Sequence, residues 1–246
     1  LLILHGLFGS LGNWGWHSKK LSEHYSVIGV DLRNHGDSPH DEELSYPTMA
    51  SDVLQLIDDL GLASVAIIGH SMGGKVAMEL ALQHHGIVDK LIVVDIAPVA
   101  YLDDSETHHR AIAGMQALNL VGLKTRDEAE KFLVGYIKEE ATRKFILTNL
   151  TRDEDKGFRW RLNLEAIEKN YGKLRMRPTG KNPYRKPTLF IKGELSNYIS
   201  SENEEEIMGL FPEAKLKTIL QAGHWLHADK PEAFQKIALN FLADKE

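Results

Sequence analysis

Short apolar runs alternate with longer amphipathic stretches along most of this chain. The runs are rich in Val, Ile and Leu and show no polar alternation, which is typical of strands covered on both faces. Stretches with helical periodicity separate most of them, and this alternation predicts an α/β fold with a mostly parallel sheet and right-handed crossovers. The predicted strands are residues 1–4, 26–31, 65–69, 91–95, 188–193 and 216–220. The predicted helices are residues 48–60, 72–84, 203–211 and 231–242, with Thr48 and Pro231 placed to start two of them.

The alternation stops between about residues 98 and 187. This stretch has helical patterns around residues 106–118, 127–140 and 142–150 but no convincing strand. We interpret it as a helical cap inserted over the carboxyl ends of the strands, which leaves residues 1–97 and 188–246 as the two parts of the core. The insertion also carries apolar and aromatic residues, most of which we expect to fill its own small core: Tyr101, Met115, Phe132, Tyr136, Phe145, Phe158 and Trp160.

Composition narrows the possible functions. The chain has 246 residues, a net charge of −6 with acids and bases interspersed, and no cysteine. Disulfides, thiolate catalysis and cysteine-ligated metal are therefore excluded, and a general nucleic-acid binder is disfavoured. No apolar run approaches the ~20 residues that a membrane-spanning helix needs. The chain opens in a strand without a methionine, so we expect residues upstream of Leu1, and the lack of cysteine favours a cytoplasmic protein.

The most informative segment is Gly69-His70-Ser71-Met72-Gly73, which lies between a predicted strand and a predicted helix. A serine at such a corner has its hydroxyl pushed out of the backbone, where a base can reach it. The flanking glycines relieve the crowding that the turn would otherwise create. In this context the pattern favours a nucleophile over an ordinary surface turn.

A serine nucleophile needs a base within hydrogen-bond reach, and the chain offers 12 histidines. His224 follows the last predicted strand, so it belongs to a loop at the same sheet edge as Ser71. His227 is a competitor, but we expect it to begin the final helix. His70 adjoins the nucleophile, and neighbours on a tight turn diverge, so we predict a structural role for it.

Six other histidines are predicted to have structural or surface positions. His5 and His35 each precede a glycine, and we expect them to brace loops. Four more are predicted to be helix-surface residues: His84, His85, His108 and His109.

A third group must hold the imidazole tautomer and stabilise its charged form. Asp95 ends the apolar strand 91–95, where a carboxylate has no packing reason to be. Asp31 ends the strand 26–31 in the same way. The strand order would separate the two candidates, but the pattern alone does not provide that order.

Four motifs along the chain resemble those of the α/β-hydrolase superfamily in residues and in order. Their sequences are most similar to those of the bacterial YbfF-type esterases and their eukaryotic abhydrolase relatives. The resemblance covers nearly the whole chain outside the insertion. The motifs are His5-Gly6-Leu7-Phe8-Gly9, Asp31-Leu32-Arg33-Asn34-His35-Gly36-x-Ser38, Gly69-His70-Ser71-Met72-Gly73-Gly74 and Gly223-His224-Trp225.

The resemblance implies a strand order. Strand 1–4 would lie between strands 26–31 and 65–69, with strand 91–95 on the other side of the nucleophile. The two usual amino-terminal strands would then lie upstream of Leu1. Asp95 would be one strand from Ser71, towards His224, whereas Asp31 would lie on the wrong side and fit a structural loop role.

One departure from the commoner family pattern bears on the acid. Many members place it in a G-x-x-D run after the strand matching 188–193, but here Gly193 is followed by Glu194, Leu195 and Ser196, with no Asp. The YbfF-type esterases share this departure and carry the acid at the end of the preceding strand. We therefore assign Ser71, Asp95 and His224 as catalytic, with Glu194 as the alternative acid.

The resemblance also implies backbone donors for a negatively charged oxygen, and we assign them to the N–H groups of Met72 and Leu7. Candidate substrate-binding side chains are Phe8, Tyr101, Trp160 and Trp225.

The predicted activity is a serine carboxylesterase or thioesterase acting on a small-molecule ester or acyl thioester, without metal or cofactor. A basic run late in the insertion could dock the phosphates of a coenzyme A thioester, although a solvated loop is the commoner explanation. Alternatives are a carbon–carbon hydrolase or lyase of the same fold, as in menaquinone biosynthesis, and a non-catalytic ligand-binding member. The basic run comprises Lys173, Arg175, Arg177, Lys181, Arg185 and Lys186.

Overall fold

The computed structural model describes residues 1–102, 106–153 and 157–243. Its main sheet has six strands, all paired in parallel, in the order β2-β1-β3-β4-β7-β8. The α/β prediction is confirmed, and so is the order implied by the resemblance, with β1 between β2 and β3. The strands are β1 (Leu2–Leu4), β2 (Ile28–Val30), β3 (Val65–His70), β4 (Val88–Val94), β7 (Thr188–Gly193) and β8 (Ala214–Ile219).

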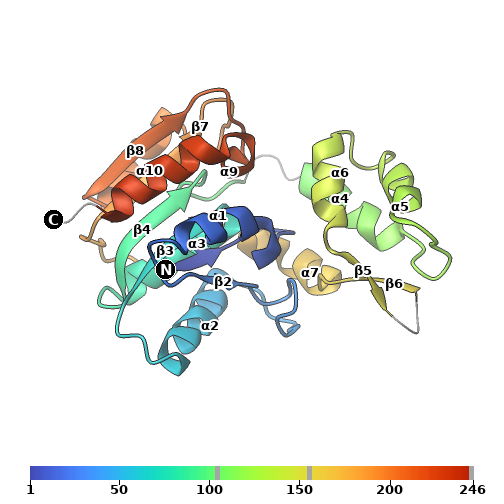
Figure 1. Cartoon of the computed structure of the whole chain (residues 1–246), viewed down its shortest axis with the longest axis horizontal. Helices are drawn as coiled ribbons and strands as arrows, with labels where there is room; N and C mark the ends of the chain where they lie inside the picture. The colour runs from blue at the N-terminus through green and yellow to red at the C-terminus, as the bar shows by residue number, and fades with distance from the viewer. Residues whose placement is uncertain (103–105, 154–156, 244–246) are drawn as a thin grey trace.

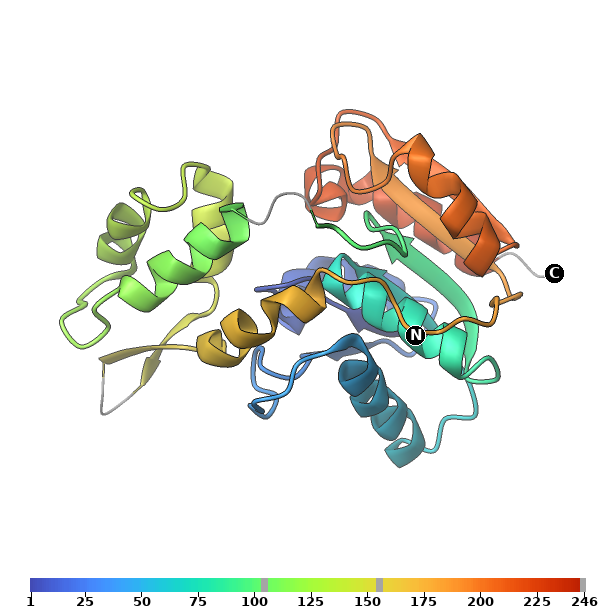
Figure 2. The same ribbon diagram turned by 180° about the vertical axis from the view of Figure 1, so that it is seen from behind.

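Helices cover both faces of this sheet (Figure 1). One face packs against α1 (Gly15–Leu21) and α10 (Pro231–Ala243), in a core that includes Ile68. The opposite face, which includes Ile67, packs against the second helical layer (Figure 2). Because adjacent residues of the central strands are buried on opposite faces, those strands have no polar side. The edge strand β8 differs, since its residues from Lys215 to Thr218 are exposed. The second layer comprises α2 (Tyr46–Asp59), α3 (Met72–Gln83) and α8 (Glu204–Leu210).

The start of α2 differs from the prediction, which placed Thr48 there. The helix begins after Ser45, whose side chain accepts from the Thr48 N–H, while the Thr48 hydroxyl accepts from the Ser45 N–H. Thr48 is therefore the third residue of the helix, paired with Ser45 in a capping box, rather than its start. Pro231 does begin α10, as predicted.

Between β4 and β7 the chain forms an insertion that lies to one side of the core (Figure 1, green to yellow). Two features of it were not predicted: a two-stranded antiparallel hairpin and a helix that precedes the return to the core. The hairpin strands have four residues each, too short to give a periodic signal. The insertion contains α4 (Glu106–Ala117), α5 (Arg126–Leu133), α6 (Glu140–Leu147), β5 (Leu150–Asp153), β6 (Gly157–Trp160) and α7 (Leu164–Leu174).

Candidate active site

Ser71 lies at the sharp turn between β3 and α3, with φ of 50° and ψ of −116°. A positive φ is strained for a non-glycine residue and is held here by close packing. A Cβ on Gly69 would lie 2.4 Å from the Gly73 carbonyl oxygen, and a Cβ on Gly73 would lie 2.5 Å from the Leu4 carbonyl oxygen. Glycine at both positions is therefore what allows the turn to pack so tightly.

Three side chains that are distant in sequence form one hydrogen-bonded chain. The Ser71 Oγ lies 3.1 Å from His224 Nε2, and His224 Nδ1 lies 2.7 Å from Asp95 Oδ2. An ionised carboxylate can only accept, so Nδ1 donates to Asp95 and leaves Nε2 as the acceptor for the serine hydroxyl. Asp95 is fully buried and His224 is half-buried. The three predicted side chains thus lie together at the carboxyl edge of the sheet.

The Asp95 carboxylate has two further donors. Its Oδ1 accepts from the Gly193 N–H at 3.0 Å, and its Oδ2 also accepts from the Ser196 hydroxyl. Ser196 was not predicted to be part of the site. The available signal was its position, because it follows β7 in the segment where the resemblance implies an acid for many family members.

The two rival acids lie elsewhere. Asp31 accepts from the N–H groups of Leu11 and Asp37, at 2.7 and 3.0 Å, and so links its own loop to the segment that precedes α1. Glu194 accepts from the Gln221 N–H at 2.8 Å. Neither carboxylate hydrogen-bonds to His224 among the described contacts.

The rival bases are buried. His70 Nε2 lies 2.9 Å from the His224 carbonyl oxygen. Because a carbonyl oxygen can only accept, His70 Nε2 is the donor. Burial holds the pKa of His70 well below its usual value, with His227 and His224 adding to the effect. His227 lies in the short helix α9 (Leu226–Asp229), stacked on Trp14 at 4.3 Å, and burial lowers its pKa to about 3. Both residues are therefore structural.

His5 and His35 brace loops, as predicted. His5 Nε2 accepts from the Leu32 N–H at 3.0 Å, and His35 Nε2 accepts from the Phe8 N–H at 3.3 Å. Burial lowers their pKa values to about 4 and about 3, so both are neutral acceptors at neutral pH.

Two backbone N–H groups beside Ser71 are available to an incoming oxygen. The N–H of Phe8 is donated to His35, and that of Gly9 to the Gly6 carbonyl at 2.9 Å. In the described part of the chain, the N–H groups of Leu7 and Met72 have no acceptor. Met72 is the first residue of α3, where main-chain N–H groups lack helical partners.

Two cavities meet at this serine, one of about 710 Å³ and one of about 240 Å³. Tyr101 lines the larger cavity, whereas Phe8 and Trp225 line the smaller one. Trp160 lines neither cavity, so its predicted role in substrate binding was wrong. It is buried inside the insertion, where its indole N–H donates to the Met115 carbonyl at 3.0 Å. The residues shared by both cavities are Leu7, Ser71, His108, Tyr198 and His224.

His108 is a second correction, because the sequence predicted a helix-surface histidine. It faces the site from α4, and its Nδ1 lies 2.7 Å from the Tyr171 hydroxyl. Tyr198 was not predicted at all, and its ring stacks on the His224 imidazole at 4.1 Å. Both contacts depend on how loops and the insertion fold over the sheet edge, which periodicity does not reveal.

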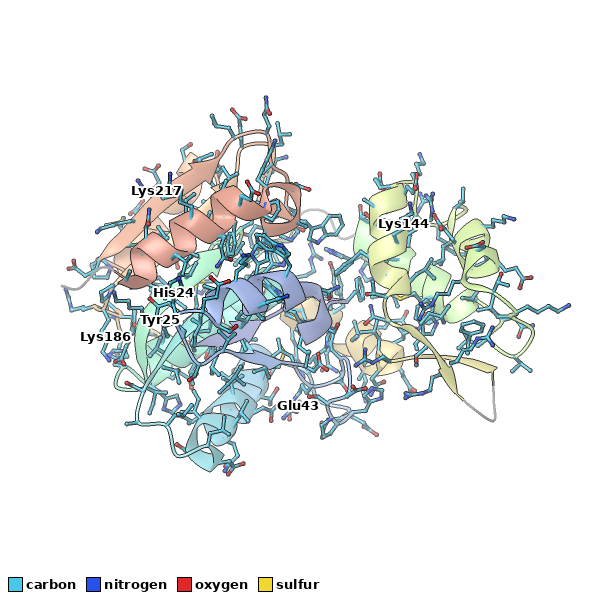
Figure 3. All side chains as sticks on the ribbon, in the orientation of Figure 1. His24, Tyr25, Glu43, Lys144, Lys186 and Lys217 are labelled. Carbon is cyan, nitrogen blue, oxygen red and sulfur yellow. The ribbon has the colours of Figure 1, made fainter. Side chains whose placement is uncertain are left out.

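The basic run of the sequence does not form one surface. Arg175 lines the larger cavity, Arg177 pairs with Glu206 at 3.1 Å, and Lys186 pairs with Asp89 at 3.0 Å. Lys186 precedes β7 and lies at the far end of the core from the insertion (Figure 3). A single phosphate-docking site made of these residues is therefore not formed.

Lys75, one turn after Ser71 on α3, is a buried cation beside the larger cavity. Its ammonium donates to the carbonyls of Val99 and Met176, at 2.7 and 2.6 Å, and so ties both ends of the insertion to α3. It also lies 4.7 Å from the centre of the Tyr101 ring. Burial lowers the pKa of Lys75 from 10.5 to about 7.

The lowered pKa predicts a pH-dependent stability. Below pH 7 Lys75 is charged in both the folded and the unfolded protein, so the free-energy cost of burying its charge is fully present. Above pH 10.5 Lys75 is neutral in both, and this cost is gone. The wild-type free energy of unfolding should therefore rise relative to that of Lys75→Met between pH 7 and 10.5. Urea unfolding at several pH values measures this difference, and the exposed Lys217→Met on β8 should show no such trend (Figure 3). A constant difference for Lys75→Met would contradict the prediction.

An α/β core that presents a serine on a strand–turn–helix corner, beside a histidine and an aspartate, defines the α/β hydrolases. The model of the alpha/beta hydrolase family matches residues 1–236, and the chain belongs to this family. It is a hydrolase similar to the YbfF-type esterases, as the resemblance implied.

Relatives match along nearly the whole chain. It is 42% identical over 250 residues to the sn-1-specific diacylglycerol lipase ABHD11 of Mus musculus, covering 99% of this chain and 80% of that one. It is 35% identical over 247 residues to Esterase YbfF of Escherichia coli, covering 99% and 93%. A solved structure of a marine microorganism esterase matches with a TM-score of 0.95 and 44% identity, covering 98% and 94%.

Within the described residues, no helix combines the length and apolar character needed to cross a membrane. No group of three or more His, Asp or Glu side chains is arranged there to hold a metal ion.

Proposed function

We propose that this protein hydrolyses carboxylic esters through an acyl-enzyme formed on Ser71. The observation that carries the proposal is the hydrogen-bonded chain from Ser71 through His224 to Asp95. His224 Nε2 takes the hydroxyl proton as the Ser71 Oγ attacks the ester carbonyl carbon. Asp95 accepts from Nδ1 and stabilises the imidazolium that forms.

The carbonyl oxygen becomes negatively charged in this step. The N–H groups of Leu7 and Met72 would donate to it, and one donor of this kind contributes ~3–4 kcal/mol to catalysis. As the intermediate collapses, His224 passes its proton to the leaving alcohol and the acyl group stays on Ser71. A water molecule, deprotonated by the same imidazole, then releases the acid and restores the serine.

Two observations favour an ester over an acyl thioester. The named relatives include an esterase and a diacylglycerol lipase, both of which act on esters. Of the six residues in the basic run, only Arg175 lines either cavity in the described part of the chain, so phosphate groups of coenzyme A lack a clustered site.

Labelling with a fluorophosphonate tests the nucleophile directly. We expect rapid, stoichiometric modification of Ser71, because Nε2 of His224 activates its hydroxyl. Mass spectrometry of the labelled peptide locates the adduct, and the Ser71→Ala variant serves as the control. Absence of an adduct on Ser71 would favour a non-catalytic binding protein.

A further inference from the structure

The two cavities that meet at Ser71 differ in chemistry as well as in size. We propose that the smaller cavity holds the acyl chain and that the larger one holds the alcohol. The substrate class is then an ester between a short to medium apolar acid and a polar alcohol. This inference rests on the proposed ester hydrolysis and deepens it.

The walls of the smaller cavity are mostly apolar. Phe8, Ala111 and Ile146 are buried there, and the rings of Phe145 and Trp225 pack 5.3 Å apart. A methylene chain gains free energy by leaving water for such a surface. A polar alcohol would leave its hydroxyl groups without partners against these walls, which costs free energy.

The larger cavity is more polar than the smaller one, although apolar side chains still form much of its wall. Its lining includes the cations Lys75 and Arg175 and the hydroxyl of Ser200, with Asn203 beside them. It reaches the surface, because Leu195 in its wall is 71% exposed. Lys75 donates to the Val99 and Met176 carbonyls, and Arg175 donates to the carbonyls of Tyr101 and Leu102. The remaining N–H groups of the Arg175 guanidinium and the Asn203 amide suit the hydroxyl groups of a polyol or similar alcohol.

The order of the chemical steps supports the same assignment. In acyl transfer the alcohol departs first, while the acyl group remains covalently attached to Ser71. The half that departs needs a path to solvent, and the water that later releases the acid needs a path inwards. The larger and more open cavity provides both, whereas the smaller and less open one suits the half that stays.

The volume of the smaller cavity sets an upper limit on chain length. The smaller cavity has about a third of the volume of the larger one, 240 Å³ against 710 Å³. Activity should therefore fall once the acyl chain is longer than this cavity can hold, and the chain-length series below locates that limit.

Two small, half-buried residues allow a matched test, Thr142 in the smaller cavity and Ala100 in the larger one. Acyl chains from two to sixteen carbons are measured as p-nitrophenyl esters. The alcohol is then varied in a series of acetate esters, from methyl acetate to glyceryl acetate. We expect Thr142→Phe to lower the ratio of kcat/KM for octanoyl over acetyl esters at least 10-fold. Ala100→Phe should instead lower the ratio for glyceryl over methyl acetate.

Phe145→Ala provides a variant in the opposite direction, because it enlarges the smaller cavity. It should move the preferred acyl chain to a greater length, and its thermal unfolding midpoint reports whether the fold is kept. If Thr142→Phe changes the alcohol profile and Ala100→Phe the acyl profile, the assignment is overturned. It is also overturned if both ratios stay within 2-fold of wild type in both variants. Wild-type protein that is labelled at Ser71 but hydrolyses none of these esters would count against the proposed function itself.

Discussion

Replacing Ser71 with alanine is expected to lower kcat/KM for p-nitrophenyl esters by about 10⁵- to 10⁶-fold, the size of loss seen when a serine nucleophile is removed. The variant has no oxygen to form the acyl-enzyme, and His224 alone leaves only weak catalysis by positioned water. The fold should persist, because the turn is held by the close packing of Gly69 and Gly73 rather than by the hydroxyl. Steady-state kinetics and far-UV circular dichroism measure the two effects.

The matched control is Ser64→Ala. Ser64 is exposed and donates to Asp89, at a position preceding β3. Its removal should change kcat/KM by less than 2-fold. Undiminished turnover in Ser71→Ala would refute the assignment of the nucleophile.

Asp95→Asn is expected to lower kcat by about 10⁴-fold, because an amide in this place favours the wrong tautomer of the histidine. The carboxylate accepts from three donors, on Gly193, Ser196 and His224. An asparagine has one acceptor oxygen and one NH₂ group, so in either orientation its NH₂ group faces at least one of these donors. Measurement of kcat at saturating substrate gives the size of the loss.

Two further variants separate Asp95 from its neighbours. Glu194→Gln removes the alternative acid and should change kcat by less than 3-fold, because Glu194 hydrogen-bonds to Gln221 rather than to His224. Ser196→Ala should cost less than Asp95→Asn, since the carboxylate keeps its Gly193 donor and its bond to His224. A larger loss in Glu194→Gln than in Asp95→Asn would move the acid to Glu194.

The sheet could be predicted from the sequence because its central strands are apolar on both faces and separated by helical periodicity. The strand order could not, since pairing partners leave no periodic signal, and it came from the resemblance alone. The hairpin of the insertion was missed for a related reason. Strands β5 and β6 have four residues each, and their pairing is set by contact with each other rather than by a buried face.

At the site, the residues within motifs were predictable and the residues supplied by loops were not. Ser71 and His224 lie in segments whose glycines mark the turn and the loop that carry them. Ser196, Tyr198 and His108 have no such markers, and only the folded chain brings them to Asp95 and His224. Trp160 was misplaced because a large aromatic in an insertion is equally consistent with a binding wall and with a core.

The insertion leaves the core after β4 and returns at β7, and these two strands pair directly, with Leu91 opposite Thr188. Its length and internal structure therefore place no demand on the register of the sheet. A different cover could be grafted between the same two neighbouring strands without disturbing the chemistry beneath it. Exchange of this segment between relatives is thus a route by which one reaction could be redirected to new molecules.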